Sequence, residues 1–160
     1  MIDKTVATCA EAVARVFDGA TLMVGGFGSP GIPGMLVEAL RKQGAKDLTI
    51  ISNNAGSDDW GLGGLIADGR VRKLVASFPN SSGGDAFRDR YLKGEIELEL
   101  VPQGTLIERI RAGGAGIGGF FTPTGVGTEL AAGKETRVID GRLQVLESPL
   151  HADFTLIKAY

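Results

Sequence analysis

A short apolar strand that leads into a glycine-rich loop and then into a helix sets the strongest constraint on how this chain can fold. Residues 21–24 form a continuous apolar run, which is typical of a strand covered on both faces. A glycine-rich loop follows at residues 25–31. Pro33 can then open a helix, because its missing N–H would have no partner in the first helical turn. This order of elements predicts the α/β class.

Strands and helices continue to alternate along the rest of the chain. Alternation of this kind predicts a largely parallel sheet. Because the sequence shows no linker and no internal repeat, we expect one domain over residues 1–160. The further strands that we expect are residues 48–51, 71–76 and 95–101, a hairpin around Asp140 and Gly141, and a last strand at residues 153–159.

Two segments have the spacing of a helix capping box, in which a hydroxyl and a carboxylate each accept a hydrogen bond from a free helix amide. The first pairs Thr8 with Glu11, and the second pairs Thr105 with Glu108. We therefore expect one helix to begin at each threonine, the second one running to about Ala112.

Glycine accounts for 25 of the 160 residues, roughly twice its ordinary share of about 7%. Hydrophobic residues at 43% and charged residues at 22% are ordinary for a globular protein, so the composition excludes a disordered chain. Most of the glycines fall in residues 25–34, 56–64 and 113–127. We interpret them as local features of a folded domain, placed where the backbone has to be free of side chains.

Charge and cysteine content narrow the range of partners and settings. The net charge is −2 with no basic block, which argues against a nucleic-acid partner. Cys9 is the single cysteine, so no internal disulfide is possible, and no Cys/His cluster has the spacing of a metal site. No apolar run approaches about 18 residues, so we expect no membrane segment and a cytoplasmic protein.

Three features follow expected strands at the point where each strand ends. They are the loop at residues 25–31, Asn53 with Asn54, and Gln103 with Gly104. In an open α/β sheet, ligands bind beyond the carboxyl ends of the strands. This convergence predicts a functional site at one edge of the sheet.

The first loop contains Gly26-x-Gly28-x-x-Gly31, which is formally the dinucleotide-binding fingerprint. The acidic residue expected at the end of the next strand is missing, because Asn53 stands there. Pro30 also removes an amide that a pyrophosphate would use. From the residues alone, three interpretations stay open: a tight turn that packs helix on strand, NAD binding, or binding of another phosphate-bearing or acyl ligand.

Two other features also have a structural and a functional interpretation. Asn53 and Asn54 could orient a substrate carboxylate, although asparagine commonly caps strand ends and turns. The glycine-rich segment at residues 113–128 could be a wall of bare backbone amides at an active site, or a wide crossover loop.

The loop and its flanks resemble the signature of a known family. The pattern is Asp18-Gly19-x-x-Leu22-Met23-Val24-Gly25-Gly26-Phe27-x-x-x-Gly31-x-Pro33, which is similar to that of the family I coenzyme A transferases. The likeness continues through residues 52–54, 101–105 and 113–128, so it covers essentially the whole chain. It is most specific for the A (alpha) subunits of the 3-oxoacid CoA-transferases.

This resemblance implies a ping-pong reaction in which a glutamate accepts CoA as a thioester. The nucleophilic glutamate belongs to a B (beta) subunit, and no glutamate of this chain matches its motif. Coenzyme A would be a substrate rather than a permanently bound cofactor, and the assembly would be an A2B2 hetero-oligomer. Residues 53–56 and 147–154 look most like the enzyme that acts on 3-oxoadipate with succinyl-CoA, and acetoacetate-using relatives are the alternative.

The resemblance also assigns roles to residues. Gln103 would contribute a backbone amide that stabilises an oxyanion, and Asn53 and Asn54 would line the substrate site. The expected CoA-binding residues are Gly25, Gly26, Phe27, Gly28, Ser29, Pro30 and Gly31.

For the fold, the resemblance implies a three-layer α/β/α domain with an open, mostly parallel sheet. Subunits of this kind normally continue beyond the point where this chain stops, so we expect a C-terminally truncated domain. The alternative function is a non-catalytic module of the α/β class that binds a nucleotide or a sugar phosphate.

Overall fold

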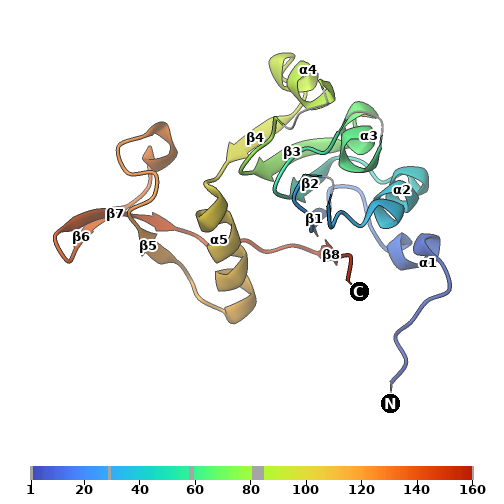
Figure 1. Cartoon of the computed structure of the whole chain (residues 1–160), viewed down its shortest axis with the longest axis horizontal. Coiled ribbons are helices and arrows are strands. Elements are labelled where there is room, and N and C mark those ends of the chain that lie inside the picture. Colours follow the sequence, from blue (N-terminus) through green and yellow to red (C-terminus); the bar gives the residue numbers. More distant parts are fainter. Residues whose placement is uncertain (1, 29, 58–59, 81–84, 160) are drawn as a thin grey trace. The chain divides into compact units, whose positions relative to one another are not determined.

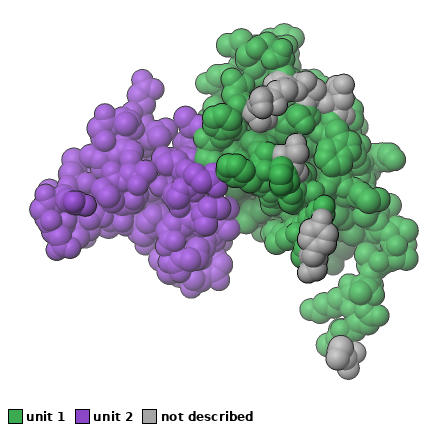
Figure 2. All heavy atoms as spheres, viewed as in Figure 1, with its two compact units in different colours: residues 1–99, 152–160 green, residues 100–151 purple. Residues whose placement is uncertain are grey.

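The chain folds into two compact units in a computed structural model that describes residues 2–28, 30–57, 60–80 and 85–159 (Figures 1 and 2). Unit 1 comprises residues 1–99 and 152–160, and unit 2 comprises residues 100–151. The helices of unit 1 are α1 (Cys9–Val13), α2 (Gly34–Gln43), α3 (Gly61–Ala67) and α4 (Ala86–Leu92). Its strands are β1 (Thr21–Val24), β2 (Leu48–Ile51), β3 (Val71–Ala76), β4 (Glu97–Leu100), which ends at the unit boundary, and β8 (Phe154–Leu156).

The sheet of unit 1 has the strand order β4-β3-β2-β1-β8. Strand β1 pairs in parallel with both β2 and β8, and β2 pairs in parallel with β3. Leu22 lies opposite Ile50 in this register, and Ile50 lies opposite Leu74. All three side chains are fully buried, as the continuous apolar runs predict. The predicted α/β class with a largely parallel sheet is confirmed.

The four helices of unit 1 form a row along one side of this sheet (Figure 1). Each packs against the next along the chain, α1 on α2, α2 on α3 and α3 on α4. Strands β1 to β4 are neighbours in sequence order, and right-handed crossovers between such strands place every connecting helix on the same face. Ile51 and Val75 alternate with the residues of the helix-covered face and are also buried, so the central strands are covered on both faces.

One of the two expected capping boxes is confirmed. The amide of Glu11 donates to Oγ1 of Thr8 over 3.1 Å, and the carboxylate of Glu11 accepts from the amide of Ala7 over 3.1 Å. The reciprocal bond therefore reaches back one residue further than the standard pattern.

The second expected capping box is wrong. Helix α5 (Gln103–Ala115) begins two residues before Thr105, with Pro102 as its N-cap and no side-chain cap. The φ of Pro102, −54°, is already near the helical value, and its carbonyl accepts from the amide of Leu106 over 2.8 Å. Glu108 instead pairs with Arg111 one turn later.

Unit 2 combines helix α5 with a small antiparallel sheet. Its remaining elements are β5 (Phe120–Thr122), the short 3-10 helix η1 (Glu129–Ala131), β6 (Thr136–Ile139) and β7 (Arg142–Glu147), and the strand order is β5-β7-β6. The predicted hairpin is confirmed: Asp140 and Gly141 have φ values of 49° and 73°, as a tight two-residue turn between twisted strands requires.

Candidate functional site

The glycine loop that follows β1 is a tight turn in which two glycines are required by the backbone. The amide of Gly25 donates to the carbonyl of Leu156 over 3.0 Å and so continues the pairing of β1 with β8. Gly26 has a φ of 126°, and a Cβ atom there would lie 2.5 Å from the side chain of Ile32. Gly31 also has a positive φ, 76°. A side chain is excluded by lack of space at Gly26 and disfavoured by the left-handed backbone at Gly31, which agrees with the tight-turn interpretation.

The tip of the loop projects a large apolar side chain. The amide of Phe27 donates to the carbonyl of Pro30 over 3.0 Å, and the Phe27 side chain is 71% exposed. Gly28, at the same tip, has a φ of 60°. Ser29, an expected CoA-binding residue, lies outside the described residues. An exposed aromatic ring on a small loop is a surface suited to contact with a ligand or a partner.

Asn53 and Asn54 follow β2 and form a connected hydrogen-bond network. Nδ2 of Asn53 donates to Oγ of Ser77 over 3.1 Å, and Nδ2 of Asn54 donates to Oδ1 of Asn53 over 3.1 Å. Oδ1 of Asn54 accepts from the amide of Gly56 over 2.8 Å. Asn54 is buried and Asn53 is half-buried. The network joins the ends of β2 and β3, so both asparagines have a structural role whatever they bind.

Gln103 is the first residue of α5, and its side chain is exposed. Its backbone amide therefore lies at the N-terminus of a 13-residue helix, where the helix dipole is positive and amides point outward along the axis. This is the kind of position in which an amide can stabilise a developing negative charge.

The structure brings two of the three predicted features to one place. Because β1 and β2 are parallel neighbours, the loop at residues 25–31 and the pair Asn53–Asn54 both lie beyond the carboxyl edge of the sheet in unit 1. Gln103 belongs to unit 2. Within unit 1, the edge is the location at which ligands of open α/β sheets bind.

The second glycine-rich segment, residues 113–128, is divided among several elements of unit 2. Gly113 lies in α5, where a Cβ atom would overlap the carbonyl oxygen of Leu150. Gly116 ends the helix in the left-handed conformation, with a φ of 70°. Gly119 lies directly before β5 and close to the carbonyl of Glu147. Several of these glycines therefore have local packing or capping roles.

A buried ionic cluster in unit 2 was not predicted from the sequence. The carboxylate of Glu147, at the end of β7, pairs with Nζ of Lys134 over 2.6 Å and lies 3.8 Å from Nε of Arg109. Glu147 is 4% exposed and Arg109 is 9% exposed. One signal was available: Arg109 occupies an apolar-stripe position of α5, together with Thr105, Leu106 and Ala112. A charged residue in such a stripe indicates a buried partner.

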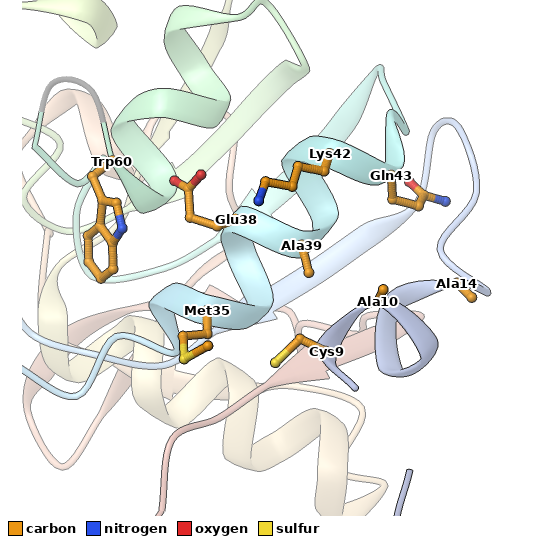
Figure 3. A pocket seen from close by; sticks show the side chains of 9 residues that line it. All are labelled: Cys9, Ala10, Ala14, Met35, Glu38, Ala39, Lys42, Gln43 and Trp60. Carbon is orange, nitrogen blue, oxygen red and sulfur yellow. The ribbon is translucent and has the colours of Figure 1, made fainter. Parts of the chain in front are cut away.

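Two of the grooves formed by the described residues of unit 1 are lined by none of the predicted site residues. The larger has a volume of about 620 Å³ and lies between α1 and α2, with Trp60 at one end (Figure 3). The second, of about 420 Å³, shares Met35 and Trp60 with the first. Its lining begins at Ile32, directly after the glycine loop.

Membrane-spanning helices and metal sites are both absent from the residues that the structure describes. No helix among them is long and apolar enough to span a membrane. No group of three or more His, Cys, Asp or Glu side chains in this part of the chain could hold a metal ion.

Comparisons with known proteins identify relatives over nearly the whole chain. Residues 6–160 match the family model described as coenzyme A transferase. The chain is 59% identical over 160 residues to the A subunit of 3-oxoadipate CoA-transferase from Pseudomonas putida, covering 100% of this chain and 69% of that protein. It is 55% identical over 145 residues to the A subunit of succinyl-CoA:3-ketoacid coenzyme A transferase from Xanthomonas campestris pv. campestris (strain B100), covering 91% and 59% respectively.

A solved structure shows the same fold. The crystal structure of an acyl-CoA transferase apoenzyme from Escherichia coli O157:H7 matches 94% of this chain with a TM-score of 0.77 at 23% sequence identity, and the match spans 33% of that longer chain. The likeness confirms the expected fold type. The relatives are longer than this chain, as the resemblance implied.

Proposed function

The chain belongs to the coenzyme A transferase family, and on that basis we propose that it is the A subunit of an enzyme that moves CoA from succinyl-CoA to a 3-oxoacid, with 3-oxoadipate as the favoured acceptor. The observation that carries the proposal is the 59% identity over the full chain to a protein of that name. Acetoacetate is the second candidate acceptor, because a relative named for 3-ketoacids is 55% identical over 145 residues.

The state of the glutamates in this chain supports a split active site. Glu147 is the buried glutamate among the described residues, and its carboxylate is held by Lys134 and Arg109. Glu38, which is partly exposed, accepts a hydrogen bond from the amide of Gly61 over 2.8 Å. Glu97 and Glu99 both pair with Lys73 at 2.9 Å on the outer strand β4. Each of these carboxylates is held by a partner within this chain, which supports our assignment of the nucleophilic glutamate to a B subunit.

The chemistry that we propose forms and breaks one bond at each step. The B-subunit glutamate attacks the thioester carbonyl of succinyl-CoA and expels CoA thiolate, which leaves a mixed anhydride. The thiolate then attacks the glutamyl carbonyl, releases succinate and forms a glutamyl-CoA thioester. The carboxylate of the 3-oxoacid repeats the two steps in reverse and leaves with CoA.

Negative charge develops on a carbonyl oxygen in each of these steps. We propose that the backbone amide of Gln103 donates a hydrogen bond to that oxygen, because a donor fixed in advance stabilises the transition state more than the substrate. The position of Gln103 at the start of α5 supports this role, since the positive end of the helix dipole adds to the donor.

We further propose that the edge of the sheet in unit 1 receives the substrates. Gly25, Gly26, Phe27, Gly28, Ser29, Pro30 and Gly31 would contact CoA. Asn53 and Asn54 would line the site of the acceptor acid; their existing hydrogen bonds would hold them rigid. The family match spans both units, which supports their acting as one A-subunit domain over residues 1–160.

The test is reconstitution. The chain is expressed with and without a B subunit, and the formation of acyl-CoA from succinyl-CoA is followed with 3-oxoadipate and with acetoacetate as acceptors. We expect transfer from the A2B2 complex, faster with 3-oxoadipate, and none from the chain alone. Transfer by the chain alone would overturn the split site.

Reconstitution and ligand binding together test whether the protein is a CoA-transferase subunit or a binding module. A stable complex that transfers CoA to neither acceptor would overturn the proposed activity. Tight binding of NAD or a sugar phosphate to the isolated chain, measured by calorimetry, would favour the non-catalytic module instead.

A further inference from the structure

Arg109 is a charged residue built into the buried stripe of helix α5. It is 9% exposed and lies one turn after Thr105 and one turn before Ala112, both of which are buried. An arginine in such a position has to find its hydrogen bonds inside the protein, because an unpaired buried charge is strongly destabilising.

Two of the partners of Arg109 lie at the end of β7 and directly after it. Nε of Arg109 donates to the carbonyl of Ser148 over 2.7 Å, and it lies 3.8 Å from the carboxylate of Glu147. The same carboxylate accepts from Nζ of Lys134 over 2.6 Å. The cluster therefore contains two cations and one buried anion, and Glu147 joins them.

Backbone contacts extend this attachment along the helix. The carbonyl of Arg109 accepts from the amide of Leu150 over 2.9 Å. One turn further on, Gly113 lies so close to the carbonyl of Leu150 that no Cβ atom fits between them. The segment at residues 147–150 is thus fixed to two consecutive turns of α5.

We propose that Arg109 and Glu147 are positioning residues for the transfer reaction, clamping α5 so that the amide of Gln103 is held at a fixed place. This inference rests on the proposed function of Gln103. Gln103 and Arg109 are six positions apart, which is about 9 Å along a rigid helix. A small tilt of α5 at the clamp therefore moves the amide, and a misplacement of about 1 Å can cost about a hundredfold in rate.

The test compares Glu147→Gln with Glu135→Gln in the complex with the B subunit. Both variants replace a carboxylate of unit 2 by a neutral amide of the same shape, but Glu135 is exposed and pairs with Arg137 at the surface. We expect Glu147→Gln to lower kcat about tenfold per folded complex, with KM for succinyl-CoA within about twofold, because ground-state binding does not use the oxyanion amide. Glu135→Gln should leave both constants unchanged.

Amide hydrogen exchange shows how firmly the clamp holds α5, independently of any measurement of enzyme activity. Amides in the middle of α5 should exchange at least about tenfold faster in Glu147→Gln than in wild type, and at an unchanged rate in Glu135→Gln. Equal exchange in Glu147→Gln and wild type would overturn the clamp. Faster exchange with an unchanged kcat would overturn its consequence for catalysis.

A second variant covers the case in which Glu147→Gln does not fold. The double variant Glu147→Gln, Arg109→Met removes the buried carboxylate and the buried guanidinium together, so it leaves no unpaired charge buried in the cluster. It should also lower kcat with little change in KM, and a wild-type kcat in a folded complex would contradict the proposal. Failure of the proposed function can be distinguished from failure of the clamp. In the first case the wild-type complex transfers no CoA, but the hydrogen-exchange comparison still shows whether Glu147 holds α5 in place.

Discussion

The two units of this protein bury different kinds of side chain. In unit 1, the interior of the parallel sheet is formed by Leu22, Leu48, Ile50 and Leu74, all fully buried. The buried charged side chains of the described residues, Arg109 and Glu147, both belong to unit 2. Unit 1 combines a large apolar interior with the neutral hydrogen-bond network of Asn53 and Asn54, whereas unit 2 also buries a cluster of charged side chains.

The difference suggests how tolerant each unit is to change. Apolar packing is the sum of many small contributions. When one buried side chain is truncated, the loss in free energy of unfolding therefore grows with the volume removed. A buried ionic cluster depends on every member being present, and removing one leaves the others unpaired. The predictions that follow test this contrast, from the largest expected effect to the smallest.

Leu74→Ala should have the largest effect on stability. Leu74 is fully buried in β3, and its truncation should lower the free energy of unfolding by about 2–5 kcal/mol. Urea denaturation measures the change. Leu92→Ala is the control, because Leu92 is 75% exposed and should cost less than about 0.5 kcal/mol. Equal costs for the two variants would contradict the assignment of the core.

Gln103→Pro should lower transfer by about a hundredfold or more, because it deletes the amide proposed to stabilise the oxyanion. The fold should tolerate the change, since proline suits the first position of a helix and Pro102 has a ψ of 140°, which is compatible with a following proline. Gln103→Ala keeps the amide and should cost much less. Steady-state kinetics of the A2B2 complex give both values, and wild-type activity in folded Gln103→Pro would remove Gln103 from the mechanism.

Two neighbouring glycines of α5 should respond in opposite directions to the same change. Gly113→Ala should destabilise by about 1–3 kcal/mol, because its Cβ atom would overlap the carbonyl of Leu150. Gly114→Ala should stabilise by about 0.5–1 kcal/mol, because nothing lies near its Cβ position and alanine favours the helix. Thermal unfolding of both variants checks the signs. The same sign for both would contradict the contact between α5 and residues 147–150.

The ion pair between Asp68 and Arg41 on unit 1 should make the smallest contribution to the free energy of unfolding among these predictions. The hydrogen bonds from Arg41, at 2.5 and 2.9 Å, hold the pKa of Asp68 below its ordinary value of 3.8. Because the native pKa is lowered, the pair stabilises the fold above about pH 4 and this contribution is lost as the pH falls through the native pKa. Both side chains are partly exposed, so solvent screening limits the effect to below about 1 kcal/mol.

The comparison of wild type with Asp68→Asn measures that contribution. The difference in free energy of unfolding should be present at pH 6 and should decrease as the pH falls from about 4 towards the lowered native pKa of Asp68. A difference that is constant over this range would show that the charge of Asp68 is not responsible.

Local patterns predicted the parts of the fold that local forces determine. The apolar run at Leu48–Ile51 became a strand buried on both faces, and the turn at Asp140 and Gly141 has the positive φ values that its residues suggest. Helix α4 (Ala86–Leu92) was not predicted. Only Phe87 in it is buried, so the sequence has no apolar stripe to reveal it.

The sequence also predicted the parts of the candidate site that follow from local patterns. The sequence placed the glycine loop and Asn53–Asn54 at strand ends, and two parallel neighbours bring them to one edge. It did not reveal the cluster of unit 2, since Arg109 and Ser148 are 39 positions apart and no periodic pattern links them. The roles of the site residues in binding and transfer remain predictions, because they depend on groups that this chain does not contain.

Trp60 lies against Gly34, the first residue of α2, and is about half exposed at the end of the groove in Figure 3. It is also the single tryptophan of the chain. The indole fluorescence of this protein therefore originates from one known position, next to the helix that follows the glycine loop. In a complex whose B subunit has had its tryptophans replaced, that emission would report changes in the surroundings of Trp60 at the start of α2, in real time and without an added dye.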